Sequence, residues 1–321
     1  MAAHTLELDV ARKRWWRRLW NSAKCWYRVP LGPASLLFRF ARSGPRQRRG
    51  WLRPDSPSIV NFFAPYANTS ERGHSEAEHD IIREVRSETA QGPVLIAGTG
   101  RGFGTAAAHY FAAHASSVGL IARNIRRLDA VASEIRGGGN AAYAYACDLT
   151  HEREVIRTVR EIVAAQGIPA LCIYAVEDFT PGDILSTEVA AFEESWRANC
   201  LGAFIVGREI GRLMAERGSG TLVFMGGTSS LLARAGYLNL AVGKHALRAL
   251  ALVMARELGP KGIHVAHCII DGEVSDTGAD SLSMNPKHVA HEIMRLHLQP
   301  NDCWTSELDL RPAREKFWEH C

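Results

Sequence analysis

From Pro93 onward, short runs of aliphatic and β-branched residues alternate with longer segments in which apolar residues recur every three or four positions. The short runs are typical of buried strands, and the longer segments are typical of amphipathic helices. Strands are predicted at 94–98, 118–122, 142–147, 171–175, 221–225, 264–270 and 307–310. The alternation predicts an α/β domain, a doubly wound parallel sheet or Rossmann fold. A ligand crevice is then expected at the carboxyl ends of the strands.

The longest helical patterns cover 192–217 and 242–258, and the last one covers 286–298. Asn285 precedes that last helix and is a favoured N-cap residue. Pro286 fits the first helical position, where no backbone donor is needed. The sequence therefore predicts a sharp start for this helix.

The first 91 residues differ from the rest in composition. Residues 1–54 hold 13 Lys and Arg against two acidic residues, and also five of the eight tryptophans, although the net charge of the whole chain is only +4. Tryptophan is scarce in disordered segments, and tryptophan and arginine dominate interface energetics. We therefore expect a docking extension at 1–91, bound to other protein subunits through residues 1–90, followed by the sheet domain and a short tail at 92–321.

Two other partners suit a basic, aromatic segment: a membrane headgroup surface and the backbone of RNA. Its composition also suits a mitochondrial targeting segment, although such segments are removed. No apolar run approaches the ~18 residues of a membrane span, which favours a soluble or peripheral protein. The seven cysteines are scattered, with no C-x-x-C pair, so the sequence predicts free thiols and no metal site.

The first predicted strand runs directly into "AGTGRGFG", a glycine cluster at 98–104 that precedes a helix. Side chains at these positions would keep a pyrophosphate away from the backbone N–H groups at the helix N-terminus. The strand before it and the helix after it favour a dinucleotide-binding loop over a merely tight turn.

The spacing of Gly98, Gly102 and Gly104 resembles the T-G-x-x-x-G-x-G motif of the classical short-chain dehydrogenase/reductase family, with Ala97 in place of the threonine. The resemblance extends over residues 92–310. It implies a Rossmann domain that binds a nicotinamide dinucleotide.

Further landmarks of that family follow in the same order. They are "CDL" at 147–149, "WRANCLG" with Asn199, Lys244, and "IIDGEV" at 269–274, where Asp271 replaces the proline of the family's P-G loop. The resemblance implies that Asp148 contacts the adenine and that Lys244 bonds the nicotinamide ribose. The residues expected to bind the cofactor are Gly98, Arg101, Gly102, Phe103, Gly104, Arg123, Asp148, Leu149, Ala175, Lys244, Gly272 and Val274.

The end of the second strand indicates which dinucleotide is bound. A carboxylate there would accept hydrogen bonds from the ribose hydroxyls and repel a 2′-phosphate. The chain has Arg123 at this point and no acid, and Arg101 adds a second base within the glycine loop. Together the two arginines favour NADP(H) over NAD(H).

The catalytic positions differ from the family's. A tyrosine is expected four residues before the lysine, and a serine thirteen residues earlier, but the chain has Leu240 and Gly227 there. General acid/base catalysis contributes typically ~10²–10⁴ in rate. Asn199 and Lys244 are retained from the catalytic tetrad, and Val176 replaces the glycine that ends the strand-four motif.

A relocated catalytic site is an alternative. Tyr237 lies seven residues before Lys244 on nearly the same helix face, and Ser229 is close to the position of the missing serine. Moving a helical side chain from 240 to 237 displaces it by about 4.5 Å along the axis and about 60° around it. That displacement argues against proton transfer within hydrogen-bond reach.

Two functions follow from these residues. The first is a catalytically degenerate family member that binds NADP(H) and serves as a structural accessory subunit of a large mitochondrial assembly, such as the respiratory chain. Mitochondrial complex I has an accessory subunit that resembles this superfamily, and a mitochondrial ribosome would suit the basic segment equally well. The alternative is an active NADPH-dependent oxidoreductase, in the cytoplasm or elsewhere, that acts on a carbonyl or hydroxyl group with Tyr237 as proton donor. A homodimer through the two long helices is the family habit.

Overall fold

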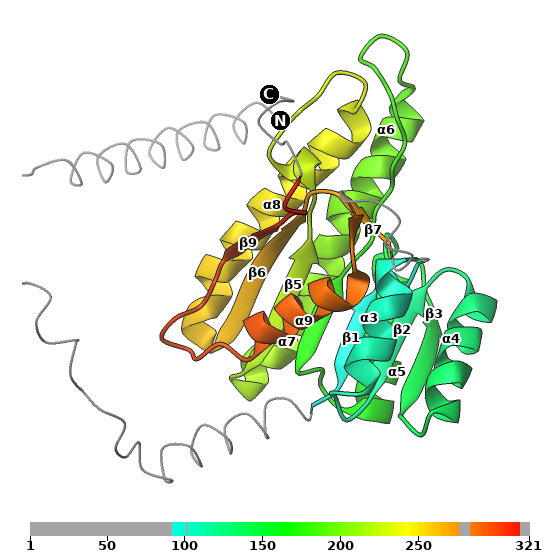
Figure 1. Cartoon of the computed structure of the whole chain (residues 1–321), viewed down its shortest axis with the longest axis vertical. Helices are drawn as coiled ribbons and strands as arrows, with labels where there is room; N and C mark the ends of the chain where they lie inside the picture. Colours follow the sequence, from blue (N-terminus) through cyan, green and yellow to red (C-terminus); the bar gives the residue numbers. More distant parts are fainter. Residues whose placement is uncertain (1–91, 101, 276–282, 315–321) are drawn as a thin grey trace, which may run out of the picture. The chain divides into compact units, whose positions relative to one another are not determined.

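The computed structural model describes residues 92–100, 102–275 and 283–314 (Figure 1). The predicted docking extension and Arg101 lie outside these residues. Among the described residues, seven parallel strands form one sheet in the order β3-β2-β1-β4-β5-β6-β9. The strands are β1 Val94–Ala97, β2 Val118–Ala122, β3 Ala142–Ala146, β4 Leu171–Tyr174, β5 Gly220–Met225, β6 Ile263–Ile270 and β9 Glu307–Leu310. The predicted doubly wound sheet is confirmed, with strand bounds within one residue of those expected.

The order of the strands reverses at β1. Val94 is in register with Val118 of β2 on one side and with Leu171 of β4 on the other. The chain builds outward to β3 first and then returns to continue from β4 in the opposite direction. In such sheets a ligand crevice forms where the carboxyl ends of the two central strands diverge.

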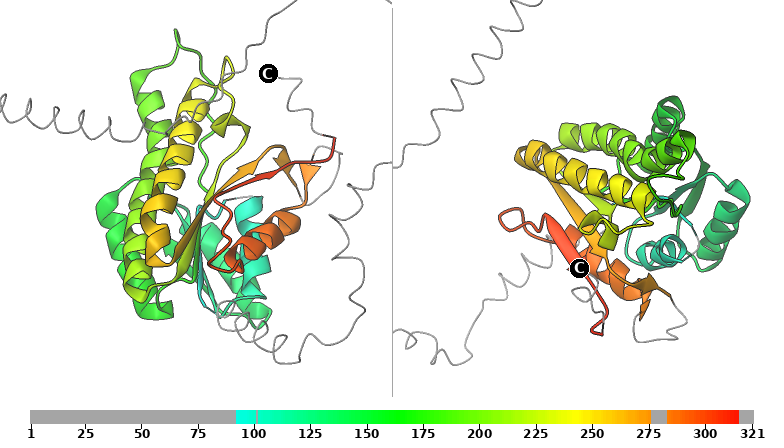
Figure 2. Two further views of the ribbon diagram at one scale, coloured as in Figure 1. Left: turned by 90° about the vertical axis from the view of Figure 1, so that its left-hand side faces the viewer. Right: turned by 90° about the horizontal axis from the view of Figure 1, so that it is seen from above.

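Helices cover both faces of the sheet, as the edge-on view in Figure 2 shows. Apolar residues of α3, α4 and α9 pack on one face, and those of α5, α7 and α8 pack on the other. The helices are α3 Phe103–Ala112, α4 Ile125–Gly137, α5 Glu152–Gln166, α6 Val189–Trp196, α7 Gly202–Arg217, α8 Leu238–Leu258 and α9 Pro286–His297. A two-stranded sheet, β7 Glu273–Val274 and β8 Ser283–Met284, lies apart from the main one.

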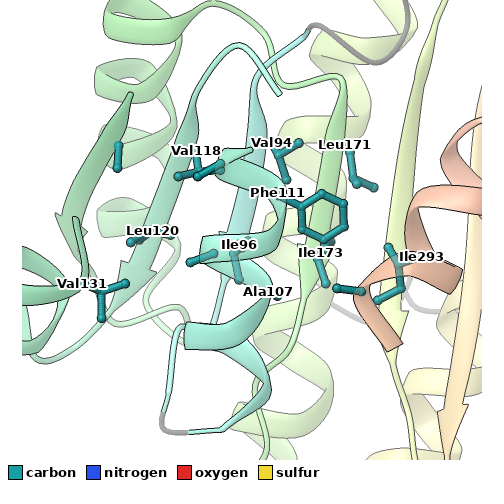
Figure 3. Close-up of a cluster of buried hydrophobic side chains, with 14 of the residues drawn as sticks. Val94, Ile96, Ala107, Phe111, Val118, Leu120, Val131, Leu171, Ile173 and Ile293 are labelled. Atoms are coloured by element: carbon teal, nitrogen blue, oxygen red, sulfur yellow. The ribbon is translucent and has the colours of Figure 1, made fainter. Parts of the chain in front are cut away.

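The core on the α3 side centres on Phe111, whose side chain is fully buried (Figure 3). It shares one hydrophobic cluster with Ile96 of β1, Leu120 of β2 and Ile293 of α9. Burial of a side chain of this size stabilises a fold by roughly 1.5–3 kcal/mol. This packing holds α3 against β1, the two elements that the glycine loop joins.

The start of α9 confirms the prediction from its sequence. The Asn285 side chain accepts a hydrogen bond of 2.9 Å from the backbone N–H of Lys287, and Pro286 occupies the first turn. The segment predicted as one long helix at 192–217 is instead divided. A π-helical turn, Arg197–Leu201, separates α6 from α7. Such turns insert extra backbone into a helix and often occur at functional sites.

Although no apolar run of membrane-spanning length was expected from the sequence, the described residues contain one helix that is long and apolar enough to cross a membrane. It covers Leu238–Lys261, with a mean hydropathy of 1.3 over its most apolar window. In the structure, 44% of that window is buried within the domain, and Leu247 and Ala251 belong to the hydrophobic core. The helix therefore has the packing of a core helix.

Candidate functional site

A cavity of about 1230 Å³ lies at the carboxyl ends of the strands. Its wall is formed by the segments that follow β1 to β6 and by the start of α8. Of the residues predicted to bind or act on a cofactor, those in the wall are Gly98, Gly102, Phe103, Gly104, Arg123, Asp148, Leu149, Ala175, Ser229, Tyr237, Lys244, Gly272 and Val274. The structure thus brings together nearly the whole predicted set, far apart in the chain, around one space.

The glycine loop has a shape that side chains would not permit. Gly98 and Gly102 have positive φ angles of 104° and 84°, which favour glycine. A β-carbon at Gly104 would lie 2.9 Å from the carbonyl oxygen of Gly98, whereas one at Gly100 would meet no atom within 4 Å. The loop is therefore tight towards β1 and open at Gly100. Open backbone at the start of α3 suits the close approach of a phosphate group.

Arg123 follows β2 and Asp148 follows β3, and both line the cavity together with the glycine loop. Arg123 is exposed and lines the cavity. The Asp148 carboxylate accepts hydrogen bonds of 2.9 and 2.8 Å from the backbone N–H and the hydroxyl of Thr150. Burial raises the pKa of Asp148, but these bonds and the charges of His151 and Arg123 outweigh it, so the pKa lies below its ordinary value. A fixed carboxylate can then accept hydrogen bonds from a ligand.

Lys244 lies on α8 with only 2% of its side chain exposed. Its ammonium group donates a hydrogen bond of 3.1 Å to the carbonyl oxygen of Met225 at the end of β5. It also lies 3.2 Å from a carboxylate oxygen of Glu177, which follows β4. A buried ammonium group requires such partners.

Asn199 is fully buried in the π-helical turn and is not among the cavity-lining residues. Its side-chain amide accepts a hydrogen bond of 3.2 Å from the backbone N–H of Asp178 and donates one of 3.1 Å to the carbonyl oxygen of the same residue. A further bond of 3.0 Å goes to the carbonyl oxygen of Ser195. In this structure Asn199 therefore fixes the chain that follows β4, next to Glu177.

Leu240 and Gly227 both lie in the cavity wall, at the positions where the family resemblance places a tyrosine and a serine. Leu240 is buried and cannot donate a proton. Val176 also lies in the wall, and its Cγ2 would be 2.8 Å from a β-carbon at Gly98. The end of the cavity around Lys244 is thus more apolar than the resemblance implies.

Tyr237 and Ser229 line the same cavity as Lys244. Tyr237 precedes the first residue of α8, is 37% exposed, and its ring centroid lies 5.8 Å from that of Phe179. Within the part of the chain that the structure describes, the polar partners found for Lys244 are Met225 and Glu177, and not Tyr237. The structure places the relocated tyrosine in the right cavity but does not join it to the lysine.

Asp271, which replaces the family's proline, makes polar contacts with two residues from different elements. Its carboxylate accepts a hydrogen bond from the Thr228 hydroxyl and pairs with the guanidinium of Arg311. Its side chain is 7% exposed. This network ties the loop that follows β5 to the end of β9 and holds Gly272 at the cavity wall. The sequence signal for it was only the acid in place of proline.

A second buried network supports the same loop from beneath. His267 on β6 is fully buried, and its Nε2 lies 3.3 Å from the hydroxyl oxygen of Ser230. The Ser230 oxygen accepts a hydrogen bond of 3.3 Å from the backbone N–H of Gly227. Burial lowers the pKa of His267 to about 4, despite the opposing charge of Glu307. His267 is therefore neutral near pH 7, and the direction of its hydrogen bond with Ser230 is set by the imidazole tautomer.

Glu177 is the residue of this site that sequence reasoning missed. It directly follows the altered strand-four motif, and an acid at that point was the only available signal. Its pairing with Lys244 depends on β4 and α8 meeting at one edge of the sheet, which the sequence pattern does not specify.

Comparison with known proteins gives the family. A family model described as short chain dehydrogenase matches residues 93–283. A short-chain dehydrogenase from Rhodopseudomonas palustris, whose structure is known, is 35% identical, with a TM-score of 0.63 over 69% of this chain and 98% of that one. The chain belongs to the short chain dehydrogenase family.

The chain is also similar to one further relative and shares its fold with one further solved structure. An uncharacterized oxidoreductase from Mycobacterium tuberculosis is 30% identical over 52% of this chain, and the match spans 64% of that protein's length. A metagenomic short-chain oxidoreductase solved in complex with NADP is 22% identical, with a TM-score of 0.62 over 70% of this chain and 99% of that one. The second likeness is one of fold.

Proposed function

We propose that this chain binds NADP(H) in the cavity at the carboxyl ends of its strands and does not carry out the tyrosine-dependent hydride transfer typical of its family. The observation that carries the proposal is the contrast between the two ends of the cavity. The glycine loop at 98–104 has an open backbone at the start of a helix, whereas Leu240 and Gly227 occupy the wall near Lys244.

The cofactor fits the residues present. The N–H groups at the start of α3 suit its pyrophosphate, whereas those of residues 98–100 bond carbonyl oxygens of the chain. Asp148 lies in the wall beside Arg123, and Lys244 and Gly272 line the far end of the cavity. When bound, NADPH supplies a hydride. The chain's own residues would bind and orient the dinucleotide, but a leucine at 240 cannot supply the accompanying proton.

The preference for NADP(H) over NAD(H) is supported by charge. Arg123 and Arg127 both line the cavity after β2, and arginine suits phosphate because its planar guanidinium group binds two oxygens at once. One relative of the same fold was solved in complex with NADP.

The test is equilibrium binding combined with turnover. The purified full chain is titrated with NADPH and NADH, and binding is followed by the fluorescence of the reduced nicotinamide. NADPH binding without steady oxidation across a panel of aldehydes and ketones is the expected result. Absence of NADPH binding would refute the proposal.

We further propose that the chain acts as a structural accessory subunit of a large mitochondrial assembly, through residues 1–90. The support is the basic, tryptophan-rich composition of that segment and the lost proton donor. The full chain is tested by native gel electrophoresis of a mitochondrial extract, beside a variant in which Trp15, Trp16 and Trp20 are replaced by alanine. Migration with a large complex, lost in the variant, is expected. Migration as a small species in both would refute this role.

The alternative is an active NADPH-dependent oxidoreductase acting on a carbonyl or hydroxyl group. One observation favours it: Tyr237 and Ser229 line the same cavity as Lys244. Steady NADPH oxidation that is abolished by Tyr237→Phe and retained in Phe179→Leu, a change to its ring partner, would establish this alternative.

A further inference from the structure

The ion pair between Glu177 and Lys244 has no assigned role in this site. The two charged groups lie 3.2 Å apart, and the side chains differ greatly in exposure: 2% for Lys244 and 52% for Glu177. Both line the cavity that also contains the glycine loop. The lysine is fixed in place, and the carboxylate reaches it from the solvent side.

The lysine ammonium can donate three hydrogen bonds. One goes to the carbonyl oxygen of Met225, at 3.1 Å, and the Glu177 carboxylate lies within reach of a second. The neighbouring His267 is neutral, since burial lowers its pKa to about 4. The Glu307 carboxylate is bonded to Arg248 at 2.6 and 2.9 Å. Glu177 therefore supplies the charge that balances Lys244.

We infer that Glu177 competes with a bound dinucleotide for Lys244 and so lowers the affinity of the cavity for its cofactor. This inference rests on the proposed binding of NADP(H). A phosphorylated dinucleotide is a polyanion, so the carboxylate opposes its approach while it also occupies a donor of the one buried cation in the described part of the cavity wall. A bound dinucleotide must then either displace the Glu177 side chain from Lys244 or bind without a hydrogen bond from that lysine donor. The half-exposed position of Glu177 permits its displacement.

If Glu177 instead supported cofactor binding, its removal would have the opposite effect on the affinity for NADP(H). If the carboxylate served only to hold the lysine in its orientation, its removal would leave a buried charge unpaired and weaken cofactor binding. The sign of the change in affinity therefore separates competition from support.

The experiment compares Glu177→Gln with Asp178→Asn in the full chain. Asp178 is the adjacent acid, lines the same cavity, and does not pair with Lys244. Its bonds with Asn199 involve backbone atoms, which the substitution leaves in place. The Asp178 carboxylate also accepts a hydrogen bond of 2.9 Å from the Thr180 hydroxyl, which the amide oxygen of an asparagine can accept in its place. Each variant loses one negative charge near the ligand, so the control reports the long-range electrostatic effect.

The expected result is that Glu177→Gln lowers the Kd for NADPH by about tenfold, which corresponds to about 1.4 kcal/mol. Asp178→Asn should change it by no more than about twofold, since this half-buried carboxylate does not pair with Lys244. The melting temperature of the free Glu177→Gln chain should fall, because Lys244 has lost its partner. Tighter binding in a less stable free protein is a combination that a purely structural role does not produce.

A double-mutant cycle tests whether the effect passes through the lysine. In a Lys244→Met background, Glu177→Gln should change the Kd for NADPH by no more than the control does. Equal effects of Glu177→Gln in both backgrounds, or weaker binding in Glu177→Gln alone, would overturn the inference while the proposed function stands. Absence of NADPH binding in every chain would overturn both. Binding detected only in Glu177→Gln would support the inference.

Discussion

Gly98, which directly follows β1, packs against Val176, which lies two residues after the end of β4. A β-carbon at position 98 would lie 2.7 Å from the backbone nitrogen of Val176 and 2.8 Å from its Cγ2. Gly98, the first residue of the glycine loop, is therefore in contact with Val176, the residue that replaces the family's strand-four glycine. The contact lies where β1 and β4 end. The end of the cavity with Lys244 and the end with the glycine loop meet at this pair.

Gly98→Ala should destabilise the fold and abolish NADPH binding. The positive φ of 104° and the close backbone of Val176 both oppose a side chain, and we expect a loss of roughly 2–4 kcal/mol from conformational strain and overpacking together. Gly139→Ala is the matched control, since its φ is 87° and a β-carbon there would meet nothing within 4 Å. It should cost about 1 kcal/mol. Urea unfolding measures both, and equal losses would contradict the packing argument.

The adjacent glycines at 226 and 227 should respond very differently to alanine. A β-carbon at Gly226 would overlap the His267 ring and lie 2.7 Å from the Ser230 hydroxyl, whereas one at Gly227 would lie 3.4 Å from the nearest atom, the carbonyl oxygen of Ile270. We expect Gly226→Ala to cost about 1–3 kcal/mol and Gly227→Ala less than about 0.5 kcal/mol. Thermal unfolding checks this, and a Gly227→Ala variant that is the less stable of the two would refute it.

The buried His267 should make the protein less stable as the pH falls below about 6.5. Its pKa in the folded chain is about 4, against an ordinary value of 6.5. Between these values the unfolded chain binds a proton that the folded chain does not, so the stabilisation is complete above 6.5 and declines towards pH 4. The two values predict a loss of about 2 kcal/mol between pH 7.5 and pH 5.

Urea unfolding of the wild type and of His267→Gln at these two pH values measures this contribution. The variant should show a smaller loss between pH 7.5 and pH 5, whatever its stability at pH 7.5. His288→Gln, a change to an exposed histidine of α9, is the matched control and should lose as much stability as the wild type. The same loss in His267→Gln as in the wild type would show that other groups cause the acid sensitivity.

Arg123→Glu should weaken NADPH binding far more than NADH binding. The side chain lines the cavity after β2, where an acid would repel a 2′-phosphate. We expect the Kd for NADPH to rise by about tenfold or more, and the Kd for NADH to change by no more than about threefold. Arg126→Glu makes the same charge change at an exposed position outside the cavity wall. If Arg126→Glu weakens NADPH binding as much as Arg123→Glu does, the effect is caused by net charge and not by a contact in the cavity.

The alternation of apolar runs and helical segments was enough to predict the sheet. β2 was expected at 118–122 and is found at Val118–Ala122, and β9 was expected at 307–310 and is found at Glu307–Leu310. β2 is a nearly continuous apolar run because it is buried on both faces, so its limits are visible in the sequence. The edge strand β9 instead alternates acidic with apolar residues, which is the pattern of a half-buried strand. The family resemblance likewise named residues that line the cavity, such as Asp148, Lys244 and Gly272.

The partners of those residues were not predictable in the same way. Lys244 was expected in the site, but its pairing with Glu177 depends on the distance between the end of β4 and α8. Asn199 was expected to act in the site, and its amide instead bonds the backbone of Asp178 from within a π-helical turn. That turn leaves no signal in a helical hydrophobic pattern, because the apolar periodicity continues on both sides of it.

The reversal of strand order at β1 also divides the cavity between two separately built parts of the chain. The segments following β1, β2 and β3 form the end with the glycine loop and Arg123, and those following β4, β5 and β6 form the end with Lys244 and Leu240. The two halves meet at the junction of β1 and β4, and their helices also pack together, α3 with α9 and α5 with α7. A protein with this architecture can exchange the chemistry of one half while the other half keeps its ligand, so recognition and reaction are free to evolve at different rates.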